Sequence, residues 1–196
     1  STTYQKVLVL GGNGFLGRHL VEDLIAKKKE VYVFDIRKHP DYDTDDNLRN
    51  NVVKFFEGDL TNEEFMLNAL LESQVDTIFH TATPSPFSSS AILHKVNIEG
   101  SKVVLSCCKK AANVKRILLV SSASVVYSGE DVKDATENTP YARTGFNGYT
   151  DSKIAQEKLF LAANNKEEFN FVKISAIRPA SSMVNVIHSC SQISLQ

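Results

Sequence analysis

Six short runs of apolar residues recur along the chain, and amphipathic or polar stretches separate them. The runs cover residues 7–10, 30–36, 52–57, 75–81, 116–120 and 169–178. The first run is apolar throughout, which is typical of a parallel strand that is buried on both faces. We therefore predict an α/β fold, a doubly wound parallel sheet of alternating strands and helices without internal repeats or long linkers.

Helical patterns fill three of the intervening stretches, at residues 16–26, 93–112 and 149–163. A fourth helix is expected to start at Thr61, because two glutamates would lie in its first turn. Residues 41–46 hold four aspartates, but Asp46 and Val52 stand where a calcium loop needs glycine and glutamate. We therefore expect residues 41–46 to form a solvated surface loop.

Three glycines at three-residue spacing, Gly11, Gly14 and Gly17, follow the first predicted strand and lead into a helix. A helix N-terminus offers free backbone amides and a positive dipole end to a phosphate. A Cβ would block the approach of backbone to pyrophosphate, and Gly17 lets the helix pack closely on the strand. Because the spacing is not GxGxxG, an ordinary glycine-rich turn stays an alternative at this point.

Acidic side chains end the second and third predicted strands. Asp35 lies 18 residues after Gly17, where a carboxylate is expected to accept hydrogen bonds from a dinucleotide ribose and repel a 2′-phosphate. This favours NAD, although Arg37 and Lys38 leave NADP open, and Asp35 could instead be a solvated acid. Asp59 could hold the adenine amino group.

The fifth predicted strand ends in a serine cluster that includes Ser122 and Ser124, and Tyr149 and Lys153 follow on a helix. Residues four apart share one helix face. A tyrosine hydroxyl ordinarily has a pKa of about 10, which makes it a poor acid/base at neutral pH. We expect a lower pKa for Tyr149, because a lysine ammonium one turn away stabilises the phenolate. A serine hydroxyl could hold the substrate oxygen, so this set predicts acid/base chemistry.

Two further helix positions and one strand position have structural interpretations beside functional ones. A glycine inside a helix costs about 1 kcal/mol, so we expect close packing at Gly100. Asn97 could hydrogen-bond backbone near a nicotinamide or be a buried polar group. His80 is interpreted as a packed strand residue, and Pro84 and Pro86 mark a loop at the carboxyl end of the sheet.

Composition excludes some classes of function. The chain has 22 basic and 23 acidic residues and a net charge of −1, so it lacks the excess positive charge of a nucleic-acid-binding protein. Three cysteines, two of them adjacent, imply no disulfide framework and favour a reducing compartment. The sequence shows no evident membrane span or secretion signal.

The motifs GGNGFLG, FDIR, GDL, NxxG, SSASVVYSGEDV and YTDSK together resemble an extended short-chain dehydrogenase/reductase. More narrowly, SSASV, TPYA, YTDSK and AIRP resemble the 3β-hydroxysteroid dehydrogenase family, above all its members that act on 4α-carboxysterols. The likeness runs from about residue 6 to residue 179. It implies a Rossmann fold and NAD(P)-dependent oxidation of a sterol 3β-hydroxyl, with decarboxylation, in sterol biosynthesis.

The resemblance also implies roles for individual residues. Tyr149 would be the catalytic acid/base, Lys153 would tune it and hold the nicotinamide ribose, and Ser122, or alternatively Ser124, would bind the substrate oxygen. The cofactor-binding residues it implies are Gly11, Gly14, Phe15, Leu16, Gly17, Asp35, Asp59, Leu60, Ala82, Asn97, Tyr149 and Lys153. No metal is implied. Homodimers through the NxxG and YxxxK helices, and a place on the cytoplasmic side of the endoplasmic reticulum with membrane association in full-length relatives, are further expectations.

The likeness stops after Pro179. We expect an NAD(P)-binding domain at residues 1–179 and a divergent tail at residues 180–196, with the C-terminal substrate region missing. One wall of the substrate site would then be absent, which argues against turnover by this chain alone. Two alternatives stay open: a nucleotide-sugar epimerase or dehydratase, and a catalytically silent NAD-binding module.

Overall fold

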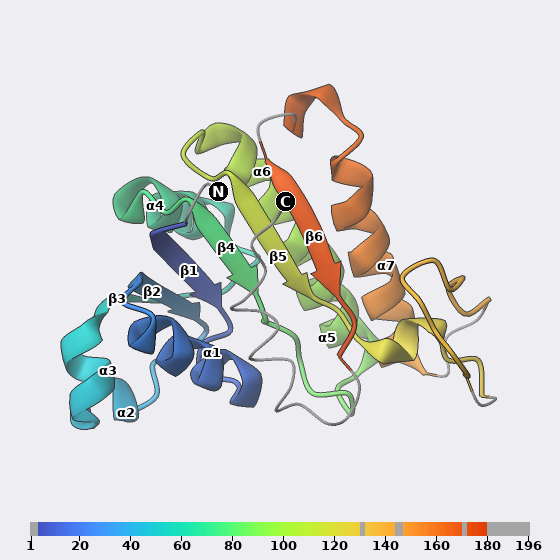
Figure 1. Cartoon of the computed structure of the whole chain (residues 1–196), viewed down its shortest axis with the longest axis horizontal. Coiled ribbons are helices and arrows are strands. Elements are labelled where there is room, and N and C mark those ends of the chain that lie inside the picture. The colour runs from blue at the N-terminus through green and yellow to red at the C-terminus, as the bar shows by residue number, and fades with distance from the viewer. Residues whose placement is uncertain (1–3, 130–131, 144–146, 170–171, 180–196) are drawn as a thin grey trace.

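The structure is a computed structural model that describes residues 4–129, 132–143, 147–169 and 172–179 (Figure 1). Its centre is a parallel sheet in the order β3-β2-β1-β4-β5-β6. The strands are β1 (Lys6–Leu10), β2 (Glu30–Asp35), β3 (Val52–Glu57), β4 (Thr77–His80), β5 (Arg116–Val120) and β6 (Lys173–Ile177). The doubly wound parallel sheet that the apolar runs predict is confirmed.

Helices cover both faces of the sheet, and a separate apolar core lies under each layer. They are α1 (Phe15–Ala26), α2 (Asp41–Thr44), α3 (Asp46–Asn51), α4 (Glu63–Ser73), α5 (Ser90–His94), α6 (Gly100–Lys110) and α7 (Gly148–Ala163), with a π-helix at Lys95–Glu99 (η1) and 3₁₀ turns at Ala123–Val126 (η2) and Glu167–Phe169 (η3). The helices α4, α6 and α7 pack on one face, and α1 with α2 and α3 packs on the other.

Strand β1 shows why its sequence has no polar positions. Leu8 and Leu10 belong to the core beneath α4, α6 and α7, whereas Val7 and Val9 belong to the core beneath α1. All four side chains are fully buried. Because side chains alternate between the faces of a strand, a strand covered on both sides must be apolar throughout.

The prediction of a surface loop at residues 41–46 is wrong. Two short helices, α2 and α3, occupy this stretch, and Tyr42 and Leu48 are buried against the core on the α1 side. Asp45 is the N-cap of α3, and its Oδ1 accepts a hydrogen bond from the Leu48 amide at 3.0 Å. The aspartates therefore cap and begin helices instead of forming a solvated loop.

The helix predicted over residues 93–112 is present, but it runs from Ser90 to Lys110 and contains a π-turn. Helix α5 ends at His94, η1 follows, and α6 begins at Gly100. The expectation of close packing at Gly100 is confirmed, because a Cβ there would lie 3.1 Å from Leu60 Cδ2. The π-turn places Asn97 inside the protein, where its Nδ2 donates to Ser152 Oγ at 3.0 Å.

Helix α4 begins two residues later than predicted. Its N-cap is Asn62, whose Oδ1 accepts from the Phe65 amide at 3.1 Å, and Glu63 is its first residue. Thr61 instead donates its hydroxyl to Asp59 Oδ1 at 2.8 Å. The side chain of Thr61 thus stabilises the strand–helix turn and not the first turn of the helix.

Two predicted strands are shorter in the structure. Strand β4 covers Thr77–His80 within the predicted 75–81, and β6 covers Lys173–Ile177 within the predicted 169–178. Phe169 belongs to η3, and residues 170–171 lie outside the described part of the chain. The predicted tail at residues 180–196 also lies outside it.

Candidate functional site

A cleft opens at the carboxyl end of the sheet, where the strand order changes direction between β1 and β4. Ligands bind at such a switch point in open α/β sheets, because the neighbouring loops diverge there. The cleft contains two adjoining cavities, one of about 400 Å³ and one of about 710 Å³. We call them the Asp35 cavity and the Tyr149 cavity. Both are lined by Gly11, Gly14, Thr81, Thr83 and Pro84.

The structure gathers the predicted site residues around these cavities, with one exception. The Asp35 cavity is lined by Gly11, Gly14, Asp35, Asp59, Leu60 and Ala82, and the Tyr149 cavity by Gly11, Gly14, Phe15, Leu16, Gly17, Ser122, Ser124, Tyr149 and Lys153. The exception is Asn97, which is fully buried and lines neither cavity. Its burial corresponds to the structural alternative considered for this residue.

The glycine turn joins the two cavities, and its spacing has a steric cause. Gly11 has a φ of +87°, and a Cβ there would lie 2.6 Å from the backbone of Ala82. A Cβ on Gly17 would lie 2.0 Å from the carbonyl oxygen of Gly11. Gly14 is the N-cap of α1, so the N-terminus of this helix opens into the cleft. These residues build a backbone cradle that suits a phosphate.

Asp35 is held by the turn that it faces. Its Oδ2 accepts from the Asn13 amide at 2.9 Å, and its Oδ1 accepts from the Ile36 amide at 2.7 Å. Partial burial raises the pKa of Asp35, and these two hydrogen bonds oppose the rise. Each carboxylate oxygen has a further lone pair for a ligand hydroxyl. Sequence reasoning missed Asn13, although its position inside the glycine turn was an available signal.

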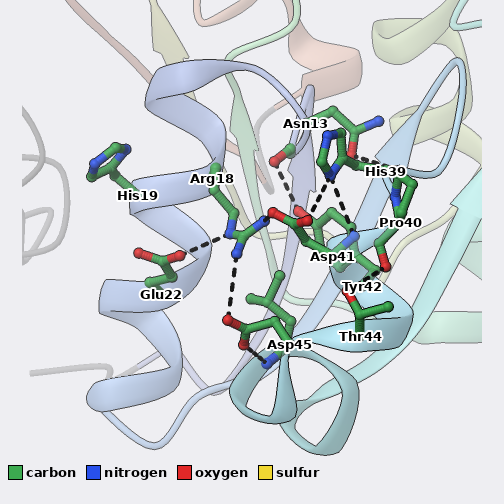
Figure 2. A network of polar contacts seen from close by, with 12 residues as sticks. Asn13, Arg18, His19, Glu22, His39, Pro40, Asp41, Tyr42, Thr44 and Asp45 are labelled. Carbon is green, nitrogen blue, oxygen red and sulfur yellow. Dashed lines mark hydrogen bonds and ion pairs between the residues drawn. The ribbon is translucent and has the colours of Figure 1, made fainter.

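A polar network fixes α2 and α3 against α1 behind the glycine turn (Figure 2). Arg18 donates from Nε to Glu22 Oε1 at 2.8 Å and from Nη1 to Asp41 Oδ2 at 2.9 Å. Tyr42 donates its hydroxyl to the carbonyl oxygen of Gly12 at 2.8 Å. The aspartate-rich segment, predicted to be a loop, therefore supports the turn from outside the cleft.

Ser122 contacts both of its neighbours in the Tyr149 cavity. Its Oγ lies 2.9 Å from Ser124 Oγ and accepts from the Ser124 amide at 3.1 Å. A hydrogen bond with Ser122 lowers the pKa of Tyr149, but burial raises it more, so the net shift is upward. Our expectation of a lowered Tyr149 pKa is therefore wrong in direction, because desolvation outweighs the stabilisation of the phenolate.

Lys153 lies fully buried beneath Tyr149 on α7. Its Nζ donates to the Val120 carbonyl at 2.8 Å and to Gln156 Oε1 at 2.6 Å. Burial lowers the pKa of Lys153 to about 7, and the negative charge of Glu157 opposes this lowering. Two of the three ammonium donors are used within the protein. The backbone of β5 and the next turn of α7 thus fix the position of the charge.

Sequence reasoning did not single out Gln156 and Glu157. Both are fully or almost fully buried. They follow Lys153 by three and four residues, so helical spacing places them beside it. An amide and a carboxylate one helical turn after the lysine were the available signal.

Buried polar side chains also lie deeper in the core. His80 is buried, and neither of its ring nitrogens has a hydrogen-bond partner within the described residues. Burial lowers the pKa of His80 to about 3, and the nearby Lys153 contributes. His80 packs edge-on against the ring of Phe160, which confirms its interpretation as a packed strand residue.

Three further features bear on what the protein can do: metal-ligating clusters, membrane-spanning helices and reactive thiols. The described ranges contain no cluster of metal-ligating side chains, and none of their helices combines the length and apolarity needed to cross a membrane. Cys107 and Cys108 are free and buried, and burial raises the pKa of both thiols.

The curated proteins that are similar to this chain in sequence are named as enzymes. The curated relatives include the decarboxylating sterol-4-alpha-carboxylate 3-dehydrogenases of Mus musculus and Candida albicans. The first is 43% identical over 89% of this chain and 45% of its own length, and the second is 36% identical over 92% and 51%. The chain thus spans about half the length of these relatives.

Solved structures repeat the fold. The UDP-glucose 4-epimerase of Bifidobacterium longum in complex with NAD+ and UDP matches with a TM-score of 0.77 and 27% identity over 88% of this chain and 52% of that one. The sequence model of the 3-beta hydroxysteroid dehydrogenase/isomerase family matches residues 8–183. The chain therefore belongs to the 3-beta hydroxysteroid dehydrogenase/isomerase family.

Proposed function

We propose that this protein oxidises the 3β-hydroxyl of a sterol that carries a 4α-carboxylate, with NAD+ as the oxidant and loss of the carboxylate as CO₂. The observation that carries the proposal is that Ser122, Tyr149 and Lys153 line the same cavity as the glycine turn. The names of the 43% and 42% identical relatives in Mus musculus and Homo sapiens support the substrate class.

The cleft fits a dinucleotide on the grounds of its own geometry. The glycine turn leaves no room for a Cβ at Gly11 or Gly17, as expected of a backbone that must approach a pyrophosphate closely. Asp35 lines the adjoining cavity and would accept from the adenosine ribose while repelling a 2′-phosphate. Asp59 and Leu60 line the same cavity at the place proposed for the adenine. NAD+ is therefore favoured over NADP+.

The side chains of the Tyr149 cavity divide the chemistry between them. The Ser122 hydroxyl holds the substrate 3β-hydroxyl, and Tyr149, as the phenolate, removes its proton. The ammonium of Lys153, one helical turn from Tyr149, would stabilise that phenolate. Bound NAD+ supplies the acceptor for the hydride that leaves C3. The new ketone lies β to the 4α-carboxylate, so the electrons of the C–CO₂ bond move toward the ketone as CO₂ departs.

A nucleotide-sugar epimerase would use the same half of the cleft. The UDP-glucose 4-epimerase of Thermus thermophilus is 28% identical, however, against 43% for the mouse sterol dehydrogenase. The higher identity favours the sterol. A catalytically silent NAD-binding module is the remaining alternative, and turnover separates it from an enzyme.

Location and assembly follow as part of the same proposal. The sterol relatives support a place on the cytoplasmic side of the endoplasmic reticulum, next to a membrane that holds the substrate. A homodimer would pair through the surface of α7 and the helical stretch from α5 to α6, two regions that pack against each other in this chain.

Calorimetric titration with NAD+ and NADP+ tests the cofactor part of the proposal. NAD+ should bind, and Asp35→Ala should weaken it about tenfold or more, because hydrogen bonds to a charged group contribute about 1.5–3 kcal/mol. Asp43→Ala is the matched control, since Asp43 is an exposed aspartate of α2 outside both cavities. A folded chain that does not bind NAD+ would contradict the proposal.

Turnover tests the substrate part. Addition of a 4α-carboxysterol to the NAD+-loaded protein should produce NADH absorbance and CO₂, and Tyr149→Phe should abolish both. Conversion of a nucleotide sugar without net NADH would support the epimerase class, because an epimerase returns the hydride to its substrate. NAD+ binding without turnover of either substrate would support the silent module.

A further inference from the structure

The carboxylate of Glu157 lies buried one helical turn after Lys153, and only 1% of its side chain is exposed. Its Oε1 accepts from Arg178 Nε at 2.9 Å and Nη2 at 2.8 Å, and from the Tyr141 hydroxyl at 3.0 Å. Its Oε2 accepts a short hydrogen bond from the Ser121 hydroxyl. Four donors from three other segments thus converge on one carboxylate.

Two of these segments border the Tyr149 cavity, since Ser121 and Pro179, the residue after Arg178, line it. Ser121 directly follows β5 and precedes Ser122, and Arg178 directly follows β6. The amide of Ser121 donates to the Ile177 carbonyl at 2.8 Å, so the ends of β5 and β6 are also paired through their backbones. Glu157 therefore joins the serine-bearing end of β5 to the helix that carries Tyr149.

The negative charge of Glu157 also acts on the Lys153 ammonium. The groups that act on the Lys153 ammonium come from two elements, the neutral His80 ring on β4 and the Glu157 carboxylate on α7. Tyr149 lies one turn before Lys153, and Arg178 and Tyr141 lie on the far side of Glu157. Glu157 is thus the negative charge that opposes the effect of burial on Lys153.

We propose that Glu157 is a positioning residue of this site, which fixes the serine segment against α7 and places a negative charge one helical turn from the buried Lys153 ammonium. The use to which that ammonium is put rests on the proposed function. The electrostatic effect itself does not, because it belongs to the protein without any ligand.

Opposite substitutions at this ion pair should shift Lys153 in opposite directions. Glu157→Gln removes the negative charge and leaves Arg178 positive, so the pKa of Lys153 should fall. Arg178→Gln leaves the charge of Glu157 uncompensated, so the pKa of Lys153 should rise. A purely structural role predicts that the pKa of Lys153 rises in both variants, because a loosened core admits water.

Side-chain NMR of the whole chain, labelled at lysine Cε and Nζ and free of cofactor, measures this directly. The Lys153 signal is identified by its absence in Lys153→Met. We expect its titration midpoint to fall by about one pH unit in Glu157→Gln and to rise in Arg178→Gln. Glu168→Gln is the control, since this half-exposed carboxylate pairs with Lys109 outside the site and should leave the midpoint unchanged.

An unchanged midpoint in Glu157→Gln, or a rise in both variants, would overturn the inference. If Glu157→Gln does not fold, a midpoint that falls or stays unchanged in Arg178→Gln overturns the inference. Titration of the unmodified chain with NAD+ separates the two proposals. A chain that fails to bind NAD+ while showing both midpoint shifts would contradict the proposed function and leave this inference standing.

Discussion

The Asp35 cavity and the Tyr149 cavity share the glycine turn but are held in place by different interactions. Residues of one β–α–β segment, from Gly11 to Asp35, line the first cavity together with Asp59, Leu60 and the loop after β4, and backbone amides hold its carboxylate. The second cavity is lined by Ser122, Tyr149 and Lys153, and the buried Glu157–Arg178 pair ties the segments beside it together. One end therefore rests on close backbone contacts and the other on buried charge.

This difference predicts how each end responds to change. Steric contacts between backbone atoms do not depend on pH, whereas buried ionisable groups make stability depend on proton uptake. Substitutions at the Asp35 end should therefore act through shape. Substitutions at the Tyr149 end should act through titration.

The largest effect is expected from Gly17→Ala. The new methyl group would lie 2.0 Å from the Gly11 carbonyl oxygen, which is backbone and cannot rotate away. We expect a loss of about 3 kcal/mol of unfolding free energy, at the upper end of typical overpacking costs, together with loss of NAD+ binding. Urea unfolding of both proteins measures the first effect.

Gly14→Ala is the matched control for this steric argument. Its Cβ would meet only the Gly11 carbonyl oxygen, at 3.3 Å, and its φ of −64° suits any residue. Its unfolding free energy should stay within about 0.5 kcal/mol of the unmodified chain. Equal losses in the two variants would show that the turn is not limited by the Gly17 contact.

A smaller effect, and one that depends on pH, is expected at His80. Burial holds its pKa at about 3 in the folded chain, against 6.5 for the ordinary side chain. Between these values the unfolded chain binds more protons, so stability falls as pH falls from about 6.5 toward 3. From about pH 7 to about pH 5 the loss should be about 2 kcal/mol.

His80→Leu sharpens this prediction, because it removes the titrating group and keeps an apolar side chain beside Phe160. Urea unfolding at the two pH values should show a loss in the unmodified chain that is about 2 kcal/mol greater than in the variant. The same pH dependence in both proteins would mean that His80 is not the group responsible.

The same contrast decides how much the sequence could reveal. Gly11, Gly14, Gly17 and the alternation of strands and helices were predictable, because a strand, a glycine turn and a helix are encoded within a few residues. Ser122, Tyr149 and Lys153 were found by type and spacing. The direction of the Tyr149 pKa shift could not be predicted, because it depends on burial by segments far apart in the sequence.

Other features escaped for the same physical reason. The π-turn η1 lies directly before Gly100, whose backbone packs on Leu60 from a distant segment. The two helices at Asp41–Thr44 and Asp46–Asn51 are too short for a periodic pattern, and burial of Tyr42 and Leu48 stabilises them. Tertiary contacts, absent from any local window of sequence, decide such elements.

The smallest effect is expected from Arg18→Met, which breaks the network behind the glycine turn (Figure 2). Arg18 pairs with Glu22 and Asp41, whose side chains are 43% and 45% exposed. Water screens partners this exposed, so the loss should be about 1 kcal/mol or less. In about 1 M salt the Debye length is about 3 Å, and the difference should shrink.

Arg49→Met serves as the control for this last comparison, because Arg49 has a single exposed partner, Asp46. Its loss should be smaller than that of Arg18→Met at low salt, since one surface pair contributes little. Urea unfolding at low and high salt measures both variants. A loss in Arg18→Met that persists unchanged at high salt would mean that its apolar stem over the Tyr42 ring, and not its charge, stabilises the turn.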